Sequence, residues 1–198
     1  MHNMSKKMVI IVLAVGMALF CAGSAGAVSL FFSPIDTETD LGSVFDIDIG
    51  ISGLQTEDLS AFRFNINFDD AIISFDSYTL YEGLGDLDAL NPIEALDYSD
   101  GDRGAGVINI GELSLLSNFS FQDNSFILAT LTFNAIGVGK TDLSFSNIKL
   151  AYDSGDPIAS AIGSGSVTVS AVPEPSTYLL LGLGLLGIAG LRKKFGNS

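Results

Sequence analysis

Residues 44–51 read Val-Phe-Asp-Ile-Asp-Ile-Gly-Ile, and residues 61–68 read Ala-Phe-Arg-Phe-Asn-Ile-Asn-Phe. In both stretches every second residue is a large apolar one, and mostly polar residues fill the positions between them. This period of two predicts a strand with one buried and one solvated face, because successive side chains of a strand point to opposite sides. The expected inward-facing residues are Phe45, Ile47, Ile49, Ile51, Phe62, Phe64, Ile66 and Phe68, and the expected outward-facing residues are Asp46, Asp48, Arg63, Asn65 and Asn67.

Seven further short apolar runs have the character of strands. They cover residues 28–32, 72–75, 78–81, 107–110, 127–133, 143–150 and 167–169. With the two stretches above they make about nine strands, which predict an all-β fold, an antiparallel β-sandwich over residues 28–170. No long helix is indicated, although short helical turns are expected at 87–96 and 112–117.

The parity of apolar residues within two runs adds detail. In the run 127–133 the expected inward residues are Ile127, Ala129, Leu131 and Phe133. In the run 143–150, Leu143 and Phe145 share one parity while Ile148 and Leu150 share the other. An extra residue in one strand exchanges its two faces, so we expect a β-bulge near Asn147.

The N-terminus has the pattern of a secretory signal peptide. Lys6 and Lys7 precede an apolar run at 8–20, and small residues follow as far as Ala25-Gly26-Ala27. Ala25 and Ala27 form an A-x-A cleavage site, so residues 1–27 are expected to be removed after Ala27. A lipid attached to Cys21 is disfavoured because Phe20 stands where a lipoprotein signal needs a small residue.

Removal of the signal peptide restricts the chemistry of the mature chain. The only histidine, His2, and the only cysteine, Cys21, leave with it. A disulfide, a zinc site of the usual nitrogen and sulfur type, a Cys-His pair and a Ser-His-Asp triad are thereby excluded. Carboxylates are abundant, but no motif marks a glycosidase pair. We therefore expect no enzymatic activity.

The charge of residues 28–170 is strongly negative. This stretch has 22 acidic residues against four basic ones, Arg63, Arg103, Lys140 and Lys149, which leaves a net charge of −18. Such a surface repels nucleic acid, so no nucleic-acid partner is expected.

Two kinds of ligand remain for the sandwich. Calcium is one, because Asp97, Asp100 and Asp102 fall within one short Asp- and Gly-rich segment, although the same residue types also form ordinary solvated turns. No other cofactor is expected. Carbohydrate is the second, but the chain has no tryptophan for ring stacking and leaves only Tyr78, Tyr81, Tyr98 and Tyr152 for that role.

The C-terminus combines three signals in order. Pro173-Glu174-Pro175 is a stiff extended segment, because each proline fixes its own φ and removes a backbone donor. Residues 178–191 are apolar with four glycines and would extend about 21 Å as a helix, which is short for a bilayer core of about 30 Å. Arg192, Lys193 and Lys194 then favour a cytoplasmic tail at 192–198. The sequence thus predicts a linker with the proline motif at 171–177 and a transmembrane helix at 178–191.

The sequence Val-Pro-Glu-Pro-Ser-Thr at 172–177, followed by the apolar segment and Arg-Lys-Lys, resembles the PEP-CTERM sorting signal of Gram-negative bacteria. The resemblance covers about 26 residues. It implies recognition by an exosortase, a membrane-embedded cysteine peptidase, with loss of the tail near Pro173 to Pro175. It further implies transient membrane anchoring, followed by transfer to the cell surface or extracellular matrix. The organism is expected to make exopolysaccharide and to form a biofilm.

The strands carry a second resemblance. Residues 44–54, 59–69 and 126–133 look like the cohesin domain, a jelly-roll sandwich of about nine strands. One departure is Asp70, where the cohesin pattern usually has proline after the Phe-Asp pair, and this leaves recognition of a dockerin unsupported. The expected function is a structural or adhesive role at the cell surface. The alternatives are a carbohydrate-binding module for exopolysaccharide and a cohesin-type protein-protein interaction module.

Overall fold

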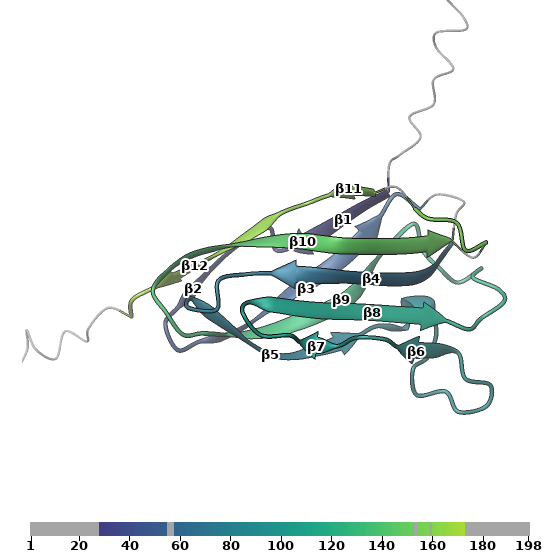
Figure 1. Cartoon of the computed structure of the whole chain (residues 1–198), viewed down its shortest axis with the longest axis horizontal. Helices are drawn as coiled ribbons and strands as arrows, with labels where there is room; N and C mark the ends of the chain where they lie inside the picture. Colours follow the sequence, from purple (N-terminus) through teal and green to yellow (C-terminus); the bar gives the residue numbers. More distant parts are fainter. Residues whose placement is uncertain (1–27, 55–57, 153, 159, 173–198) are drawn as a thin grey trace, which may run out of the picture.

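The computed structural model describes residues 28–54, 58–152, 154–158 and 160–172. They fold into two β-sheets packed face to face (Figure 1). The elements are β1 (Val28–Ser33), β2 (Asp36–Asp40), β3 (Val44–Ser52), β4 (Leu59–Asn67), β5 (Ile73–Leu80), the 3-10 turn η2 (Glu82–Leu84), β6 (Ala95–Asp97), β7 (Gly101–Asp102), β8 (Val107–Ser114), β9 (Ser125–Ala135), β10 (Gly139–Tyr152), β11 (Ser160–Ile162) and β12 (Gly165–Ser170).

One sheet has five strands and the other has seven. One, the β3 sheet, has the order β11-β1-β3-β9-β5, and the other, the β4 sheet, has the order β2-β12-β10-β4-β8-β6 with β7 pairing on β8. Pairing is antiparallel except for β1 with β11 and β12 with β2. The described chain enters at one end of the sandwich and leaves at the opposite end, after β12 (Figure 1). The expected all-β sandwich is confirmed.

The core lies between the sheets and is built from the inward rows. Phe62, Phe64 and Ile66 of β4 are buried, as are Ile47, Ile49 and Ile51 of β3. Aromatic rings join the two layers, since Phe32 of β1 stacks on Phe145 of β10 with ring centroids 4.2 Å apart. Phe64 meets the same Phe145 ring edge to face at 5.3 Å. The predicted inward faces of β3 and β4 are therefore confirmed.

Bulges decide where the parity of a strand changes. The expected bulge at Asn147 is confirmed, because the register between β10 and β4 shifts between Ser146 and Lys149 and Asn147 has a φ of 51°. A second register shift lies between Ile49 and Gly50 of β3, where β9 carries Leu128 as an extra residue. Leu128 is buried and Ile127 is only half-buried, so the inward placement of Ile127 was wrong.

Other expectations need correction. The helical turns at 87–96 and 112–117 are wrong, because these ranges contain the strand β6 and the end of β8, and the 3-10 turn instead covers Glu82–Leu84. The runs 72–75 and 78–81 form one strand, β5, with an irregularity between Phe75 and Ser77. Four short strands were not expected at all: β2, β6, β7 and β11.

Three expected segments lie outside the described residues: the signal peptide at 1–27, the membrane helix at 178–191 and the basic tail at 192–198. Within the described ranges, no helix is long and apolar enough to cross a membrane.

Candidate functional site

The outer face of the β4 sheet carries a groove, and its floor is made by small residues. Ala61 of β4 lies beside Ala151 of β10 on one side and beside Leu113 of β8 on the other. These positions point away from the core, because they alternate with the buried Phe62 and Leu150. Two alanines in adjacent strands leave a hollow over the backbone of the sheet.

Long side chains in the next outward row form the wall of this hollow. Arg63 of β4 pairs with Lys149 of β10 and with Gly111 of β8. Tyr98 covers the β8 side, and its backbone N–H donates to the Gly111 carbonyl at 2.8 Å. The result is an outer groove of about 270 Å³ lined by Ala61, Phe62, Arg63, Tyr98, Glu112, Leu113, Lys149, Leu150 and Ala151.

A polar network fixes the position of the Arg63 side chain. Its Nε donates to Asn109 Oδ1 at 2.9 Å, and its Nη2 donates to Asp100 Oδ2 at 2.7 Å. Asn109 is almost fully buried and donates through Nδ2 to Asn65 Oδ1 at 2.7 Å. Asn65 faces outward as expected, yet it is buried by these neighbours. The guanidinium at the groove is thus oriented rather than free.

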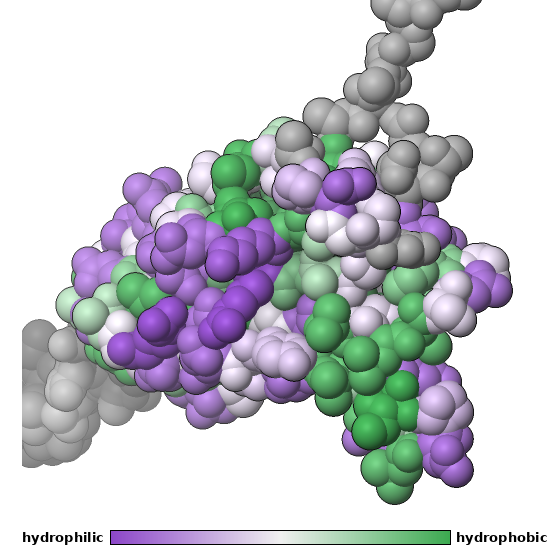
Figure 2. Space-filling model, turned by 45° about the vertical axis from the view of Figure 1, so that its right-hand side comes forward, coloured by the Kyte–Doolittle hydropathy of each residue, from purple (hydrophilic) through white to green (hydrophobic). Residues whose placement is uncertain are grey.

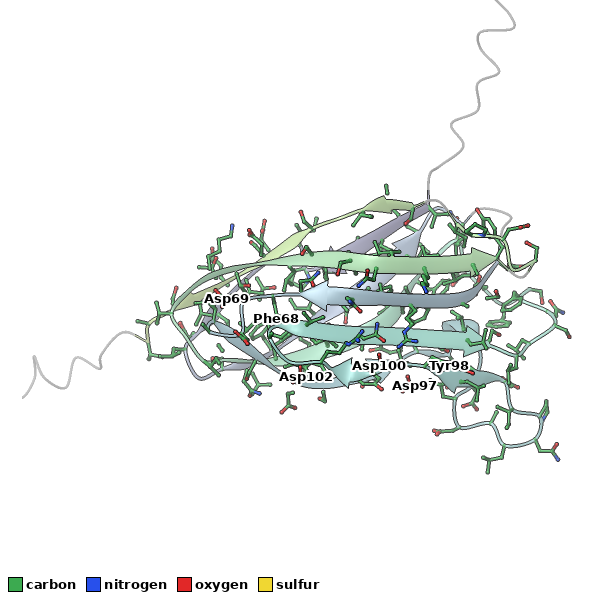
Figure 3. The ribbon with its side chains drawn as sticks, viewed as in Figure 1. Phe68, Asp69, Asp97, Tyr98, Asp100 and Asp102 are labelled. Carbon is green, nitrogen blue, oxygen red and sulfur yellow. The ribbon has the colours of Figure 1, made fainter. Side chains whose placement is uncertain are left out.

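The expected calcium residues are used in other ways (Figure 3). Asp97 accepts hydrogen bonds from the Tyr78 hydroxyl at 2.7 Å and from the Ser99 backbone, and Asp102 accepts from the Gly104 backbone. Asp100 holds Arg63, with Arg103 at 3.7 Å. Within the described ranges, no group of three or more acidic, histidine or cysteine side chains is placed to hold a metal ion. The structure therefore does not bring these three carboxylates together as a metal site.

Glu112 lies on the other side of the same sheet. It pairs with the inward-facing Phe62 in β4 and with Asp97 in β6, so its side chain points between the two sheets. The side chain is 1% exposed, and neither carboxyl oxygen has a hydrogen-bond partner. Burial, with a smaller contribution from the Asp97 charge, raises the pKa of Glu112 to about 8. Glu112 is therefore protonated at neutral pH.

Of the four tyrosines considered for sugar stacking, two pack against the core and two are exposed at the surface. Tyr78 and Tyr152 pack against the core. Burial is the main cause that raises the pKa of Tyr78, and its hydrogen bond to Asp97 adds to the effect. Tyr81 bonds through its hydroxyl to Thr130 at 3.0 Å. Tyr98 is half-exposed and is the tyrosine that borders the outer groove.

The Phe-Asp pair that precedes Asp70 lies at the end of the sandwich opposite to the loop between η2 and β6 (Figure 3). Phe68 packs edge to face on Phe133 at 5.3 Å. The Asp69 carboxylate accepts from the Ala71 backbone at 2.9 Å, which stabilises a tight turn. This side-chain bond holds the turn where the expected family pattern has a proline, so Asp70 is accommodated at an exposed position.

The sorting residues named from the sequence lie outside the described part of the chain: Ala25, Ala27, Pro173, Glu174, Pro175, Arg192, Lys193 and Lys194. Residues 171–194 match the family described as PEP-CTERM protein-sorting motif. The chain carries a PEP-CTERM sorting motif. This motif implies exosortase-sorted export with membrane anchoring before processing. No curated protein matches the chain.

Several solved structures of cohesins resemble the sandwich. The sixth cohesin of Acetivibrio cellulolyticus scaffoldin B, solved in complex with a Cel5 dockerin mutant, has 16% identity and a TM-score of 0.58, over 73% of this chain and 99% of that one. A type I cohesin-dockerin complex from Clostridium thermocellum has 8% identity and a TM-score of 0.60, covering 73% and 100%. A non-cellulosomal cohesin of Archaeoglobus fulgidus has 11% identity and a TM-score of 0.55, covering 77% and 96%. The fold is therefore cohesin-like.

The groove itself was not found from the sequence, although Arg63 was expected to face outward and Tyr98 was considered for sugar stacking. Ala61 and Ala151 are unremarkable small residues in two runs far apart in the chain, and only strand register brings them together. Glu112 and Leu113 fell in a range expected to be helical, which hid their opposite orientations. One signal was available, because the run at 107–110 continues to residue 114, and the parity of Ile108 and Ile110 places residue 112 inward and residue 113 outward.

Proposed function

We propose that this protein is an exported cell-surface module whose sandwich binds another protein through the outer groove of the β4 sheet. The observation that carries the proposal is a preformed apolar hollow bordered by an oriented Arg63 and by Lys149. A groove of this kind, with apolar floor and convergent polar groups, is typical of a binding site. The dockerin complexes of the similar cohesins support a protein as the ligand.

In this proposal the sorting motif leads to attachment of the processed protein at the cell surface or in the extracellular matrix. The role is structural or adhesive: the processed chain holds a partner close to the cell. Catalysis has no place in it, because Glu112, whose pKa is raised toward neutrality, has both carboxyl oxygens enclosed between the sheets. A substrate in the outer groove would meet the backbone of the Glu112 strand rather than its carboxyl group.

Site-specific photo-crosslinking tests the binding function. A photoreactive amino acid replaces Leu113 in the full chain expressed at the surface of its own cells, and crosslinked partners are identified by mass spectrometry. We expect a discrete protein adduct. The matched control places the same group at Ile162, an exposed residue of β11 in the other sheet, and should give no adduct. Equal labelling from both positions, or none from Leu113, would reject the proposal.

Sorting is tested by the intact mass of the mature protein from the cell surface or medium. A mass that fits residues 28 to 172 or 175, alone or with an added group, supports processing at the proline motif. Glu174→Ala should leave export intact but keep the protein in the membrane. A mature mass that includes residues 178–198 would mean a permanent anchor instead.

Carbohydrate is a second candidate ligand, and the half-exposed Tyr98 ring beside two cationic side chains is the observation that favours it. A ring of this kind stacks on a sugar, and Arg63 and Lys149 suit an acidic polysaccharide. Retention of the mature protein on the organism's own exopolysaccharide, lost in Tyr98→Ala but kept in Tyr81→Ala, would select this function over protein binding.

A further inference from the structure

The loop between η2 and β6, residues 85–94, projects from the body at the end opposite to Val172 (Figure 1). We call it the projecting loop. Its Leu90 is 88% exposed and Ile93 is 49% exposed. Figure 2 shows a hydrophobic protrusion at this end of the molecule. Leu115 continues the apolar surface, because its backbone N–H donates to the Glu94 carbonyl at 2.7 Å. Apolar side chains gathered on a protrusion mark a contact surface.

The stem of the projecting loop holds the apolar tip away from the body. The Gly85 N–H donates to the Glu82 carbonyl at 3.2 Å, and the Asp86 N–H donates to Glu94 Oε2 at 3.2 Å. Gly85 has a φ of +131°, and a Cβ at this position would lie 2.9 Å from the Glu94 carbonyl oxygen. Glycine therefore lets the two arms of the loop close on each other. A tip fixed in this way loses little conformational freedom on binding.

The charge around the tip restricts what it can contact. Asp86, Asp88 and Glu94 lie in the loop, and no lysine or arginine occurs between Arg63 and Arg103. A complementary surface must therefore offer an apolar hollow bordered by cations. The outer groove has both properties, because Lys149 borders it together with Arg63, whose guanidinium is shared with Asp100 at 2.7 Å.

We propose that the projecting loop of one copy inserts Leu90 into the outer groove of a second copy of this chain. This inference rests on the proposed function, because it names a partner for the same groove. Asp86, Asp88 and Glu94 then face Arg63 and Lys149 of the second copy. Because the loop and groove are different surfaces, repeated insertion links copies head to tail. The net charge of −18 on residues 28–170 opposes the contact at a distance, and crowding of anchored copies raises their effective concentration.

Cysteine crosslinking tests the contact directly, since residues 28–198 contain no cysteine. Two differently tagged full-length copies are expressed together, one with Leu90→Cys and the other with Ala151→Cys. A short bismaleimide should then join the two tags. In the control Val138→Cys, which is more exposed than Ala151 but lies in the turn between β9 and β10, replaces Ala151→Cys and should give no mixed dimer.

Charge reversal separates docking from chance collision. Lys149→Glu in the Ala151→Cys copy should lower the crosslinking yield about fivefold or more, because it places a carboxylate opposite the acidic loop. Adding Asp88→Lys to the Leu90→Cys copy should restore the yield. Lys140→Glu, at the far end of β10, makes the same change in net charge and should leave the yield unchanged.

Two results would overturn this inference. One is the absence of a Leu90–Ala151 crosslink when both copies reach the surface, and the other is an equal loss of yield in Lys149→Glu and Lys140→Glu. The photo-crosslinker at Leu113 distinguishes a failure of self-docking from a failure of the proposed protein-binding function. Capture of a different protein without any self-adduct rejects self-docking and supports the proposed function. Capture of no protein rejects both.

Discussion

The inner and outer faces of β10, β4 and β8 are made by alternate residues of the same strands, yet they accommodate charged side chains in different ways. On the inner face Glu112 is enclosed without a hydrogen-bond partner, and its charge is removed by protonation. On the outer face Arg63 is only half-buried but has two side-chain partners. The inner residues therefore determine whether the sheet is stable, and the outer residues determine what it can contact. Substitutions at two adjacent positions of one strand therefore have different effects: one changes the stability of the sheet, and the other changes what the sheet can bind.

The largest expected difference in the free energy of unfolding is between substitution of Phe64 on the inner face and substitution of a residue on the outer face. Phe64 is fully buried and contacts the ring of Phe145, so Phe64→Ala should lower the free energy of unfolding by about 3–5 kcal/mol. Lys149→Ala on the outer face should change it by less than about 0.5 kcal/mol. Urea denaturation of the mature protein measures both. A loss below about 1 kcal/mol in Phe64→Ala would mean that the two faces do not differ as described.

The next effect is a pH dependence from the inner face. Because the pKa of Glu112 is about 8 in the folded state and near 4.5 when unfolded, the folded state holds a proton that the unfolded state releases. Stability should therefore be greatest below about pH 4.5 on this account and fall as pH rises to 8, by at most roughly 1.4 kcal/mol per pH unit. Glu112→Gln should remove this slope.

Denaturation curves between pH 5 and 9 measure the effect. Glu38→Gln, which changes an exposed glutamate of β2, is the matched control and should keep the slope of the wild type. A slope that persists in Glu112→Gln would assign the pH dependence to other groups.

A smaller effect is expected at the outer polar network. Arg63 and Asp100 are 41% and 47% exposed, so solvent screens their ion pair, and a double-mutant cycle should give a coupling of about 0.2–1 kcal/mol that decreases with salt. The cycle between Arg103 and Asp100, whose atoms are 3.7 Å apart, should give less. A coupling between Arg63 and Asp100 above about 2 kcal/mol would show that this pair behaves as a buried one.

The smallest effect on stability is expected beside Glu112. Leu113→Ser changes a half-buried residue of the outer groove and should alter the free energy of unfolding by about 0.5 kcal/mol or less. It should nevertheless reduce the capture of protein by a photo-crosslinker placed at Ala151. Thr168→Ser, on the outward face of β12, controls for a change elsewhere on the sheet and should not reduce capture. A variant that unfolds instead would place Leu113 in the core.

The period of two in β3 and β4 allowed the sandwich and most of its core to be predicted, because each strand has one apolar face. The bulge at Asn147 was found because the residues on either side of it are polar and apolar in clear alternation. The bulge at Leu128 was missed because Ile127 and Leu128 are both apolar, so that either assignment satisfies the pattern. The strand β2 was missed because its sequence Asp-Thr-Glu-Thr-Asp has no large apolar residue and its pairing with β12 fixes it.

The site was harder to predict than the fold, since it depends on which strands become neighbours. Asp100 was expected to bind a metal cation together with nearby carboxylates, but it instead accepts a hydrogen bond from Arg63, which is 37 positions away in the sequence. Likewise, the groove exists because Ala61 and Ala151 fall in register, which neither run of sequence reveals. The PEP-CTERM motif was predictable from the sequence because its parts are contiguous.

The position of the C-terminus has a mechanical consequence. The described chain leaves after β12 at one end of the sandwich, while the projecting loop lies at the other, and the strands of the β4 sheet run lengthwise between them (Figure 1). A pull between an attachment beyond Val172 and a partner bound near the loop would act along β12. That strand is bonded on both sides, to β10 and to β2. The load would shear these two ladders as a whole rather than unzip them one bond at a time.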